Sequence, residues 1–514
     1  MCIRDRNKYS KHSFRYLSLI LIAIGIASTL AFSFADKAKS FDNQVHSQAD
    51  DPLSFNIGME RDILISGEGT SDDFGDALAV ADLNGDGQMD LAVGAKEHEP
   101  GSVSNLGAVF VFFGPLTDAD ISASNAPLTI IGPGRSEIAG ASLAAGDLNG
   151  DGVQDLAIGA PKSPNGNIAM TGAVHILYGP FQPGNITISD EADATVLGPL
   201  MSEATGTGVA IGDLNDDGIP DLAIGSTLAG RPVVGEVAIA FGPIGSGPMN
   251  LPDVTDLVIT GTVRGEDAGD ALSIGDLDGD GSNELVVGAP GTGFSTFDAT
   301  GRGKDEGTAI TRIGIFYGPL ESSEEKIKFD DAGYIIKAPG EDENEYFGGA
   351  VYVGDADGDG VNDLAVGGMG IVVGERIGTG QVSIIRGPLD DVNFFRGGDH
   401  WSNQQTAKIK KAANLIVSGE SAIERLGSAI AIADINGDGI TDLILGSNGA
   451  NSSNGEEPGT VSVMLGNIFD REPTPEASGT GPITIFAIIA IVAVVIVGGG
   501  LLYIRRIRKA PPVA

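Results

Sequence analysis

The sequence is poor in cysteine, in aromatic side chains and in basic residues. Its one cysteine is Cys2, so a disulfide framework within the chain is excluded. Lysine and arginine number 31 against 70 acidic residues, which gives a formal charge of −39 over 514 residues. Because binding to nucleic acid requires clustered basic side chains that neutralise phosphates, nucleic acid is excluded as a partner.

The abundance of glycine, 77 residues against 6% aromatics, favours many short strands joined by tight turns. Between the two ends of the chain no long stretch combines helical periodicity with helix caps. The acidic excess has two interpretations, a solvated repelling surface or a set of metal ligands. The placement of the carboxylates decides between them.

Each end of the chain carries a membrane signal. Basic residues followed by an apolar run, with small residues before Ala35, predict a signal peptide over 1–35, or alternatively an uncleaved anchor helix. The uncharged apolar run 482–504, followed by basic residues, predicts a transmembrane helix whose cytoplasmic tail is 505–514. A linker over 36–60 and a stalk over 467–481 complete the expected organisation: one pass, N-terminus outside, at the cell membrane.

A repeat occupies residues 61–466, and a fixed period of this kind indicates a propeller or a solenoid. Each unit reads as four strands: a first strand of small residues, a loop rich in aspartate, a second strand, a bulkier third strand ending in Gly-Pro, and a short fourth strand. The loops begin at Asp82, Asp147, Asp213, Asp276, Asp355 and Asp434.

The strand count favours a closed ring. A fourth-strand pattern over 62–66 precedes the first unit, and the last unit lacks one after its third strand near Leu465. The N-terminal strand would therefore complete the last blade and cover its open edge. We predict an all-β, six-bladed propeller of four-stranded blades, with seven blades left open as an alternative.

Calcium binding is predicted for the six aspartate-rich loops, which place side-chain oxygens at positions 1, 3, 5 and 9 and glycine at position 6. Position 7 would contribute its backbone carbonyl, which is why its side chain varies. The predicted ligands, loop by loop, are Asp82, Asn84, Asp86, Gln88 and Asp90; Asp147, Asn149, Asp151, Val153 and Asp155; Asp213, Asn215, Asp217, Ile219 and Asp221; Asp276, Asp278, Asp280, Ser282 and Glu284; Asp355, Asp357, Asp359, Val361 and Asp363; Asp434, Asn436, Asp438, Ile440 and Asp442.

The competing interpretation is that Asp, Asn and Gly only make good turns. A turn needs one or two such residues, whereas these loops repeat four oxygen-bearing positions at fixed spacing. The start of each loop also matches an EF-hand, but strands flank it and position 12 lacks the bidentate glutamate, so an EF-hand is rejected. About six structural Ca²⁺ ions are expected.

The repeat resembles the FG-GAP repeat of integrin α-chain head domains. Phe74-Gly75 and Phe347-Gly348 match the FG element, and Gly159-Ala160-Pro161 and Gly288-Ala289-Pro290 match the GAP element. The resemblance implies a calcium-bearing propeller. Integrin heads are seven-bladed and carry leg domains, which have no counterpart here, so pairing with an integrin β chain is not implied.

For function we predict adhesion or ligand binding at the cell surface, with an extracellular protein or glycan as partner and no enzymatic activity. The loops 289–311 and 387–413 are candidate contact segments because they carry Phe294, Phe297, Arg302 and Lys304, and Phe394, Phe395, Arg396, His400 and Trp401. These aromatics could equally be buried by their own loops. A polysaccharide-acting enzyme on the propeller and a structural envelope component are the alternatives.

Overall fold

The computed structural model describes most of the repeat region and little outside it. The described residues are 52–69, 71–100, 105–230, 232–291, 296–297, 303–304, 311–337, 346–374, 376–389, 405–408, 413–450 and 458–473. The predicted signal peptide, transmembrane helix and cytoplasmic tail, and most of the stalk, lie outside them. No helix among the described residues has the length and apolar character needed to cross a bilayer.

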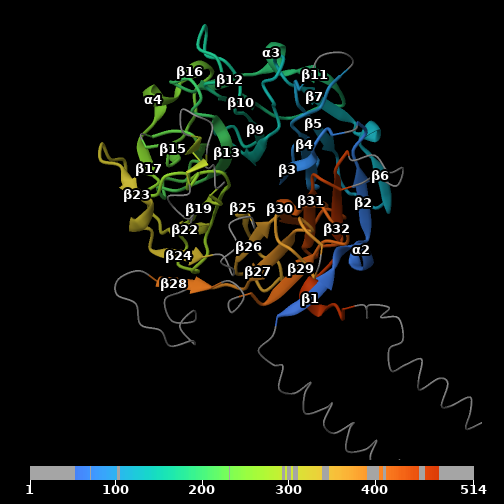
Figure 1. Cartoon of the computed structure of the whole chain (residues 1–514). Coiled ribbons are helices and arrows are strands. Elements are labelled where there is room, and N and C mark those ends of the chain that lie inside the picture. The colour runs from blue at the N-terminus through green and yellow to red at the C-terminus, as the bar shows by residue number, and fades with distance from the viewer. Residues whose placement is uncertain are drawn as a thin grey trace, which may run out of the picture.

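The described residues form an all-β propeller of six blades, as the sequence predicted (Figure 1). The innermost strand of each blade contacts the innermost strands of the blades before and after it, and the sixth contacts the first. These first strands are β3 (Phe74–Ala81), β8 (Ser142–Gly146), β13 (Thr205–Gly212), β18 (Leu272–Gly275), β25 (Phe347–Gly354) and β30 (Leu426–Ala433).

The next three strands of every blade are antiparallel to their neighbours. The second strands are β4 (Asp90–Ala95), β9 (Asp155–Ala160), β14 (Asp221–Ser226), β19 (Glu284–Ala289), β26 (Asp363–Gly368) and β31 (Asp442–Ser447). The third strands are β5 (Ala108–Phe112), β10 (Ala173–Leu177), β15 (Glu236–Ala240), β22 (Arg312–Phe316), β27 (Gln381–Ile385) and β32 (Thr460–Met464). The fourth strands are β7 (Leu128–Ile131), β12 (Ala194–Leu197), β17 (Leu257–Thr260), β24 (Tyr334–Lys337), β29 (Leu415–Ser418) and β2 (Ile63–Ser66).

Each blade has a fifth, outermost strand, so the prediction of four-stranded blades was wrong. The extra strand runs parallel to the fourth strand, and in five blades it is supplied by the connection between the third and fourth strands of the next blade. It is short, and its described side chains are exposed or half-buried except for Phe55, so in most blades it carries no apolar alternation to predict it. The fifth strands are β11 (Gly184–Thr187), β16 (Gly247–Asn250), β23 (Ile327–Lys328), β28 (Gln405–Lys408), β1 (Leu53–Asn56) and β6 (Asp120–Ser122).

The N-terminal segment closes the ring twice. Its strand β2 pairs antiparallel with β32, as expected, and completes the last blade. Its strand β1 pairs parallel with β29 as the fifth strand of the blade before. Residues 53–60 therefore belong to the ring, which begins before residue 61, within the range expected to be a linker. Arg471 then joins the two ends, since it pairs with Asp62 and donates to the carbonyl of Glu60 at 2.8 Å.

Helices are limited to single turns among the described residues. Three α-helices of one turn, α2 (Ile57–Glu60), α3 (Ile188–Glu191) and α4 (Leu251–Val254), each follow a fifth strand. Three 3₁₀ turns are η1 (Ala123–Asn125), η2 (Phe329–Asp331) and η3 (Ile468–Asp470), and a two-residue hairpin pairs β20 (Thr296–Phe297) with β21 (Gly303–Lys304).

The core lies between the blades. On β9, Leu156 and Ile158 pack toward the first blade, while Ala157 packs toward the third. Both faces of the second and third strands are therefore buried, which explains their apolar runs. Burial of each large apolar side chain, such as Leu156 or Ile158, stabilises the fold by roughly 1.5–3 kcal/mol.

Glycine residues without a Cβ allow neighbouring blades to pack closely. A Cβ on Gly94 of the second strand would lie 2.1 Å from the carbonyl oxygen of Gly140, which begins the next blade. The same clash recurs at the closure, where a Cβ on Gly446 would lie 2.1 Å from the carbonyl oxygen of Gly75. The repeated glycines of the sequence are thus required by the close contact of adjacent blades.

Candidate metal centres

The aspartate-rich loops connect the first and second strands of each blade. In the first blade, Asp82 follows β3, and Asp90 at position 9 begins β4. All six loops therefore lie at the same end of the ring, which we call the loop face. The strands set only the two ends of each loop, so the turn between them depends on its own side chains.

The position 1 carboxylate folds the loop around itself. Asp82 Oδ1 accepts from the backbone N–H groups of Gly85 and Asp86, at 2.8 and 3.0 Å, and Oδ2 accepts from Gly87 at 2.8 Å. Gly87, at position 6, has a φ of +87°, which a side chain would strain. This geometry explains the glycine that the sequence repeats there.

Positions 3 and 5 continue the same curl. Asn84 Oδ1 accepts from Asp86 N–H at 2.8 Å, and Asp86 Oδ1 accepts from Gln88 N–H at 2.9 Å. The alternate side chains therefore turn toward the inside of the loop, where a cation would sit. The position 7 N–H is used by this bond, and the role of its carbonyl as a ligand remains a prediction.

The position 9 carboxylate is buried and ties the loop to the blade. Asp90 is fully buried; its Oδ2 accepts from Leu83 N–H at 2.9 Å and its Oδ1 from Gly114 N–H at 2.8 Å. Desolvation raises the pKa of all six position 9 carboxyls, to about 6 in Asp155 and Asp363 and to about 7 in Glu284. A buried carboxylate in this state is stabilised by a bound cation.

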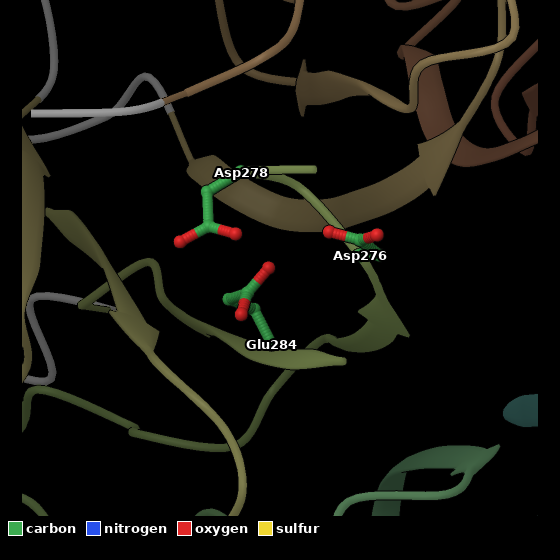
Figure 2. Close-up of side chains that lie close together, drawn as sticks. All are labelled: Asp276, Asp278 and Glu284. Carbon is green, nitrogen blue, oxygen red and sulfur yellow. The ribbon is translucent and has the colours of Figure 1, made fainter. Parts of the chain in front are cut away.

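Three carboxylates converge in two of the loops. Asp276, Asp278 and Glu284 bring one oxygen each within 4.8 Å of one another, and Figure 2 shows them pointing toward a common centre. Asp355, Asp357 and Asp359 do the same in the fifth blade. These two loops have aspartate at position 3, where the other four have asparagine, whose neutral oxygen replaces one carboxylate.

The donors fit calcium. They are oxygens from carboxylates, with side-chain amides in four loops, and Ca²⁺ takes six to eight such ligands at about 2.3–2.6 Å. Neither cysteine nor histidine occurs among the loop positions, so the set is unlike that of zinc. The described loops therefore offer the oxygen donors that a hard divalent cation prefers.

The loops also lie at the seam between blades. The carbonyl of Leu83 accepts from Phe181 N–H of the second blade at 2.8 Å, and that of Leu148 accepts from Ile244 N–H of the third at 3.0 Å. Leu83 itself is completely buried. These loops are therefore hydrogen-bonded directly to the next blade.

The two candidate contact segments are only partly described. In 289–311, Phe297 and Lys304 fall in the hairpin β20–β21, whereas Phe294 and Arg302 lie outside the described residues. In 387–413, the strand β28 is present, but Phe394, Phe395, Arg396, His400 and Trp401 all lie outside the described residues. The contact role of these side chains remains a prediction.

Comparison with known proteins supports the repeat assignment. The FG-GAP repeat family matches residues 74–112, 139–177, 205–239, 268–306 and 426–464. The matches fall on the first, second, third, fourth and sixth blades. The fifth blade is unmatched, although it has the same strands and a loop of the same geometry.

Two groups of curated proteins are similar to the chain. Phosphatidylinositol-glycan-specific phospholipase D of Rattus norvegicus is 25% identical over 317 residues, covering 59% of this chain and 34% of that protein; the Homo sapiens protein is 30% identical over 220 residues, covering 41% and 24%. Integrin alpha-3 of Cricetulus griseus is 33% identical over 185 residues, covering 34% and 17%. The chain thus spans about a third or less of the length of these relatives.

Proposed function

The described ring is an FG-GAP β-propeller of the integrin-α-like kind, and from this premise we propose that it is a calcium-loaded binding module outside the cell. Calcium would occupy the six loops and hold neighbouring blades together, and the face opposite the loops would bind a protein or glycan. The observation that carries the proposal is the buried position 9 carboxylate at every blade seam, as in Asp90.

The expected energetics make calcium structural. Extracellular calcium modules bind with Kd values of roughly 10⁻⁴–10⁻³ M. At ten times Kd, each site would add about 1.4 kcal/mol to the free energy of unfolding. Six independent sites would add roughly 8 kcal/mol, which is comparable with the whole net stability of a typical domain.

The ligand face would be the one opposite the loops. The connections between second and third strands, and those between blades, expose large apolar side chains there, among them Met170, Met201 and Ile377. Met170 and Met201 lie on touching segments, since the carbonyl of Met170 accepts from Ser202 N–H at 2.8 Å. Exposed apolar tips of this kind suit recognition of another macromolecule.

One experiment tests both that the ring binds a ligand and that the face opposite the loops is the one that binds it. Beads coated with the ring would be offered to a glycan array and to immobilised extracellular proteins, in calcium and in chelator. We expect calcium-dependent retention that Met201→Asp weakens and that Glu191→Gln, an exposed substitution outside these apolar tips, leaves unchanged. Equal retention by both variants would contradict a ligand site on this face.

The membrane arrangement is part of the same proposal. The apolar segments 1–35 and 482–504 would act as signal peptide and single transmembrane helix, with the propeller outside and residues 505–514 in the cytoplasm. A protease added to intact cells would then remove the propeller and spare a tag fused after Ala514.

A polysaccharide-acting enzyme remains the second candidate and a structural envelope role the third. The relatives named phospholipase D are much longer than the matched region, so their activity is not carried over. We propose that this chain is not an enzyme. Turnover of acidic polysaccharides by the purified ring would contradict this, and the absence of both turnover and binding would favour the structural role.

A further inference from the structure

Three loop positions depart from the repeat in the third, fourth and fifth blades. Position 4 is glycine in five of the aspartate-rich loops but Asp216 in the third. Position 7 is Ser282 in the fourth loop, where the other loops have glutamine, valine or isoleucine. Position 8 is Asn283 in the fourth loop and Asn362 in the fifth, where the others have methionine, glutamine, proline or threonine. The structure brings these departures into contact.

Two side-chain hydrogen bonds cross the seam between the third and fourth loops. Asn283 Nδ2 donates to the backbone carbonyl of Asp213 at 2.8 Å, and Ser282 Oγ donates to Asp216 Oδ2 at 2.9 Å. Asp216 has a φ of +61°, a conformation that glycine adopts at lower cost. The third loop therefore carries an aspartate in place of glycine at the point where it bonds to the fourth loop.

The seam between the fourth and fifth loops repeats the asparagine bond. Asn362 Nδ2 donates to the backbone carbonyl of Asp276 at 3.0 Å. Asn283 and Asn362 each come directly before the position 9 residue of their own loop, and each reaches the position 1 residue of the loop before. Each bond therefore joins the end of one predicted calcium site to the start of another.

The other seams lack this bond. Position 8 of the second loop is Gln154, whose side chain makes no hydrogen bond among the described residues, and Pro220 in the third loop has no side-chain donor. Asn467 Nδ2 donates to the carbonyl of Asp357 in the fifth loop at 2.5 Å, but Asn467 follows the third strand of the sixth blade and is not a loop residue. Within the described part of the chain, side chains therefore join loop to loop only from the third blade to the fifth.

A backbone bond is common to seams with and without the asparagine. The carbonyl of Leu214 accepts from Leu320 N–H at 2.7 Å, as that of Leu83 accepts from Phe181 N–H at 2.8 Å. These bonds join a loop to the segment after the third strand of the next blade, and not to the next loop. The asparagines therefore distinguish the third, fourth and fifth loops from the first and second.

From these bonds we infer that the third, fourth and fifth loops bind calcium cooperatively, with Asn283 and Asn362 as the positioning residues that couple them. The inference rests on the proposed function, in which calcium occupies the loops. Calcium in the fourth loop would draw Asp276 and Glu284 toward one centre. Asn283, next to Glu284, would then hold the backbone of Asp213, whose carboxylate is position 1 of the third loop.

The coupling has a physical cause in the order of the loops. A loop without its ion crowds several carboxylates together, which repel one another. A filled neighbour that already fixes one end of the loop lowers the cost of ordering it around an ion. One net hydrogen bond corresponds to about a fivefold change in affinity, and the effect of each loop on the other must be equal.

The test is a calcium titration of the full chain, purified in detergent, with calcium chloride as the only added ligand. Hydrogen–deuterium exchange, read by mass spectrometry, gives a midpoint for each loop, because the N–H groups of Gly218 and Gly281 are bonded to position 1 carboxylates. We expect the third, fourth and fifth loops to titrate with a Hill coefficient above about 1.5 and the first loop with one of about 1.

Substitutions show which seam carries the coupling. Asp280→Asn keeps an oxygen at position 5 but removes its charge, so it should weaken the fourth site and raise the midpoints of the third and fifth loops by about fivefold. The first loop should not shift. Adding Asn283→Leu should abolish the shift of the third loop alone, and adding Asn362→Leu that of the fifth alone. Gln154→Leu, at the same position of the second loop, is the matched control and should leave both shifts in place.

A reciprocal variant leaves the seam intact, so it serves even if Asn283→Leu does not fold. Asp217→Asn weakens the third site at position 5 and should raise the midpoint of the fourth loop by the same factor that Asp280→Asn produces in the third. A purely structural role of Asn283 would change the melting temperature but would not make one loop respond to the other.

The inference is overturned if Asp280→Asn shifts the fourth loop while the third and fifth stay in place. A shift of the third loop that survives Asn283→Leu, or an equal shift of the first loop, would also overturn it. In these cases calcium still binds, and the proposed function is unaffected. If calcium protects none of the loops, the proposed function and the inference are both contradicted.

Discussion

The carboxylate of Asp90 and the backbone N–H of Gly114 are joined by a hydrogen bond of 2.8 Å that links a loop to the end of the third strand of its blade. The same bond recurs at 3.1 Å between Asp155 and Gly179, and at 2.9, 2.8 and 2.6 Å in the third, fifth and sixth blades. The acceptor is in each case the first residue of the second strand. In these five blades one buried carboxylate therefore connects the loop with the second and third strands.

The substitution Asp155→Asn should lower the free energy of unfolding more in calcium than in the absence of calcium. In calcium the substitution removes a charged ligand, and we expect a loss of about 1–3 kcal/mol in the free energy of unfolding. In chelator, burial destabilises the ionised carboxylate. The loss of free energy of unfolding caused by Asp155→Asn should therefore be smaller in chelator than in calcium, by at least about 1.4 kcal/mol. Urea unfolding in both conditions measures the difference, with Glu191→Gln as the exposed control. Equal costs would mean that Asp155 is not a ligand.

In the loop of the fourth blade, substitutions at two predicted ligand positions, 1 and 3, are expected to have different effects on calcium-dependent stability. Asp276 accepts from the N–H groups of Gly279 and Gly281, at 2.7 and 3.0 Å, and Asp278 accepts from the N–H of Asp280 at 3.0 Å. Position 3 is asparagine in four other loops, so Asp278→Asn should be tolerated with a small loss of calcium-dependent stability. Asp276→Asn should lose at least three times as much. Calcium titrations of the melting temperature compare them, and the reverse order would refute the ligand assignment.

A buried histidine makes stability depend on pH. His175 lies on β10, is 7% exposed, and burial lowers its pKa to about 4 from 6.5. The unfolded chain binds a proton there below pH 6.5 and the folded chain does not until about pH 4, so stability falls as the pH drops through this window. The full loss is about 3 kcal/mol.

His175→Leu removes this proton uptake, and comparison with the parent isolates it. Carboxyls with raised pKa values, such as Asp270, act in the opposite sense, because protonation relieves their burial as the pH falls. They are the same in both proteins and cancel. The difference in free energy of unfolding should change by about 3 kcal/mol between pH 7 and pH 4. A constant difference would show that His175 is already charged or solvated in the fold.

The N-terminal strand should be essential to the last blade. Ile65 is completely buried between β32 and the first blade, whereas Leu64, one residue before, points to the other face and is half-buried. Ile65→Ala should cost about 2–5 kcal/mol and Leu64→Ala clearly less. Chemical unfolding measures both. Equal small costs would mean that the ring closes without this strand.

The repeat allowed much of this fold to be predicted. The closing strand expected over 62–66 is observed as Ile63–Ser66, because its apolar residues alternate and the last blade lacked a partner. The fifth strand was missed because segments such as Gly184–Thr187 are polar and pair with a blade other than their own. The local pattern of residues in such a segment does not show that the segment pairs with a neighbouring blade.

The loop ligands could be predicted because one loop contains all of them. That Asp76 and Asp270 line the same inner cavity could not be predicted, because the first and fourth blades come together there only when the ring closes. The sequence did contain one indication of their equivalent positions, because Asp76 directly follows the Phe74-Gly75 element and Asp270 directly follows the equivalent Gly269. Asn448 Oδ1, which has no hydrogen-bond partner among the residues that the structure describes, is left so by packing and has no counterpart in the sequence pattern.

Thermal unfolding of the purified ring in millimolar calcium and in excess chelator tests the central claim most directly. If calcium bound in six seam loops holds the blades together, the chelator should lower the melting temperature by roughly 5–10 degrees, as expected for a loss of up to roughly 8 kcal/mol, and added calcium should restore it. A melting curve that is the same in calcium and in chelator would contradict a structural role for calcium in this propeller.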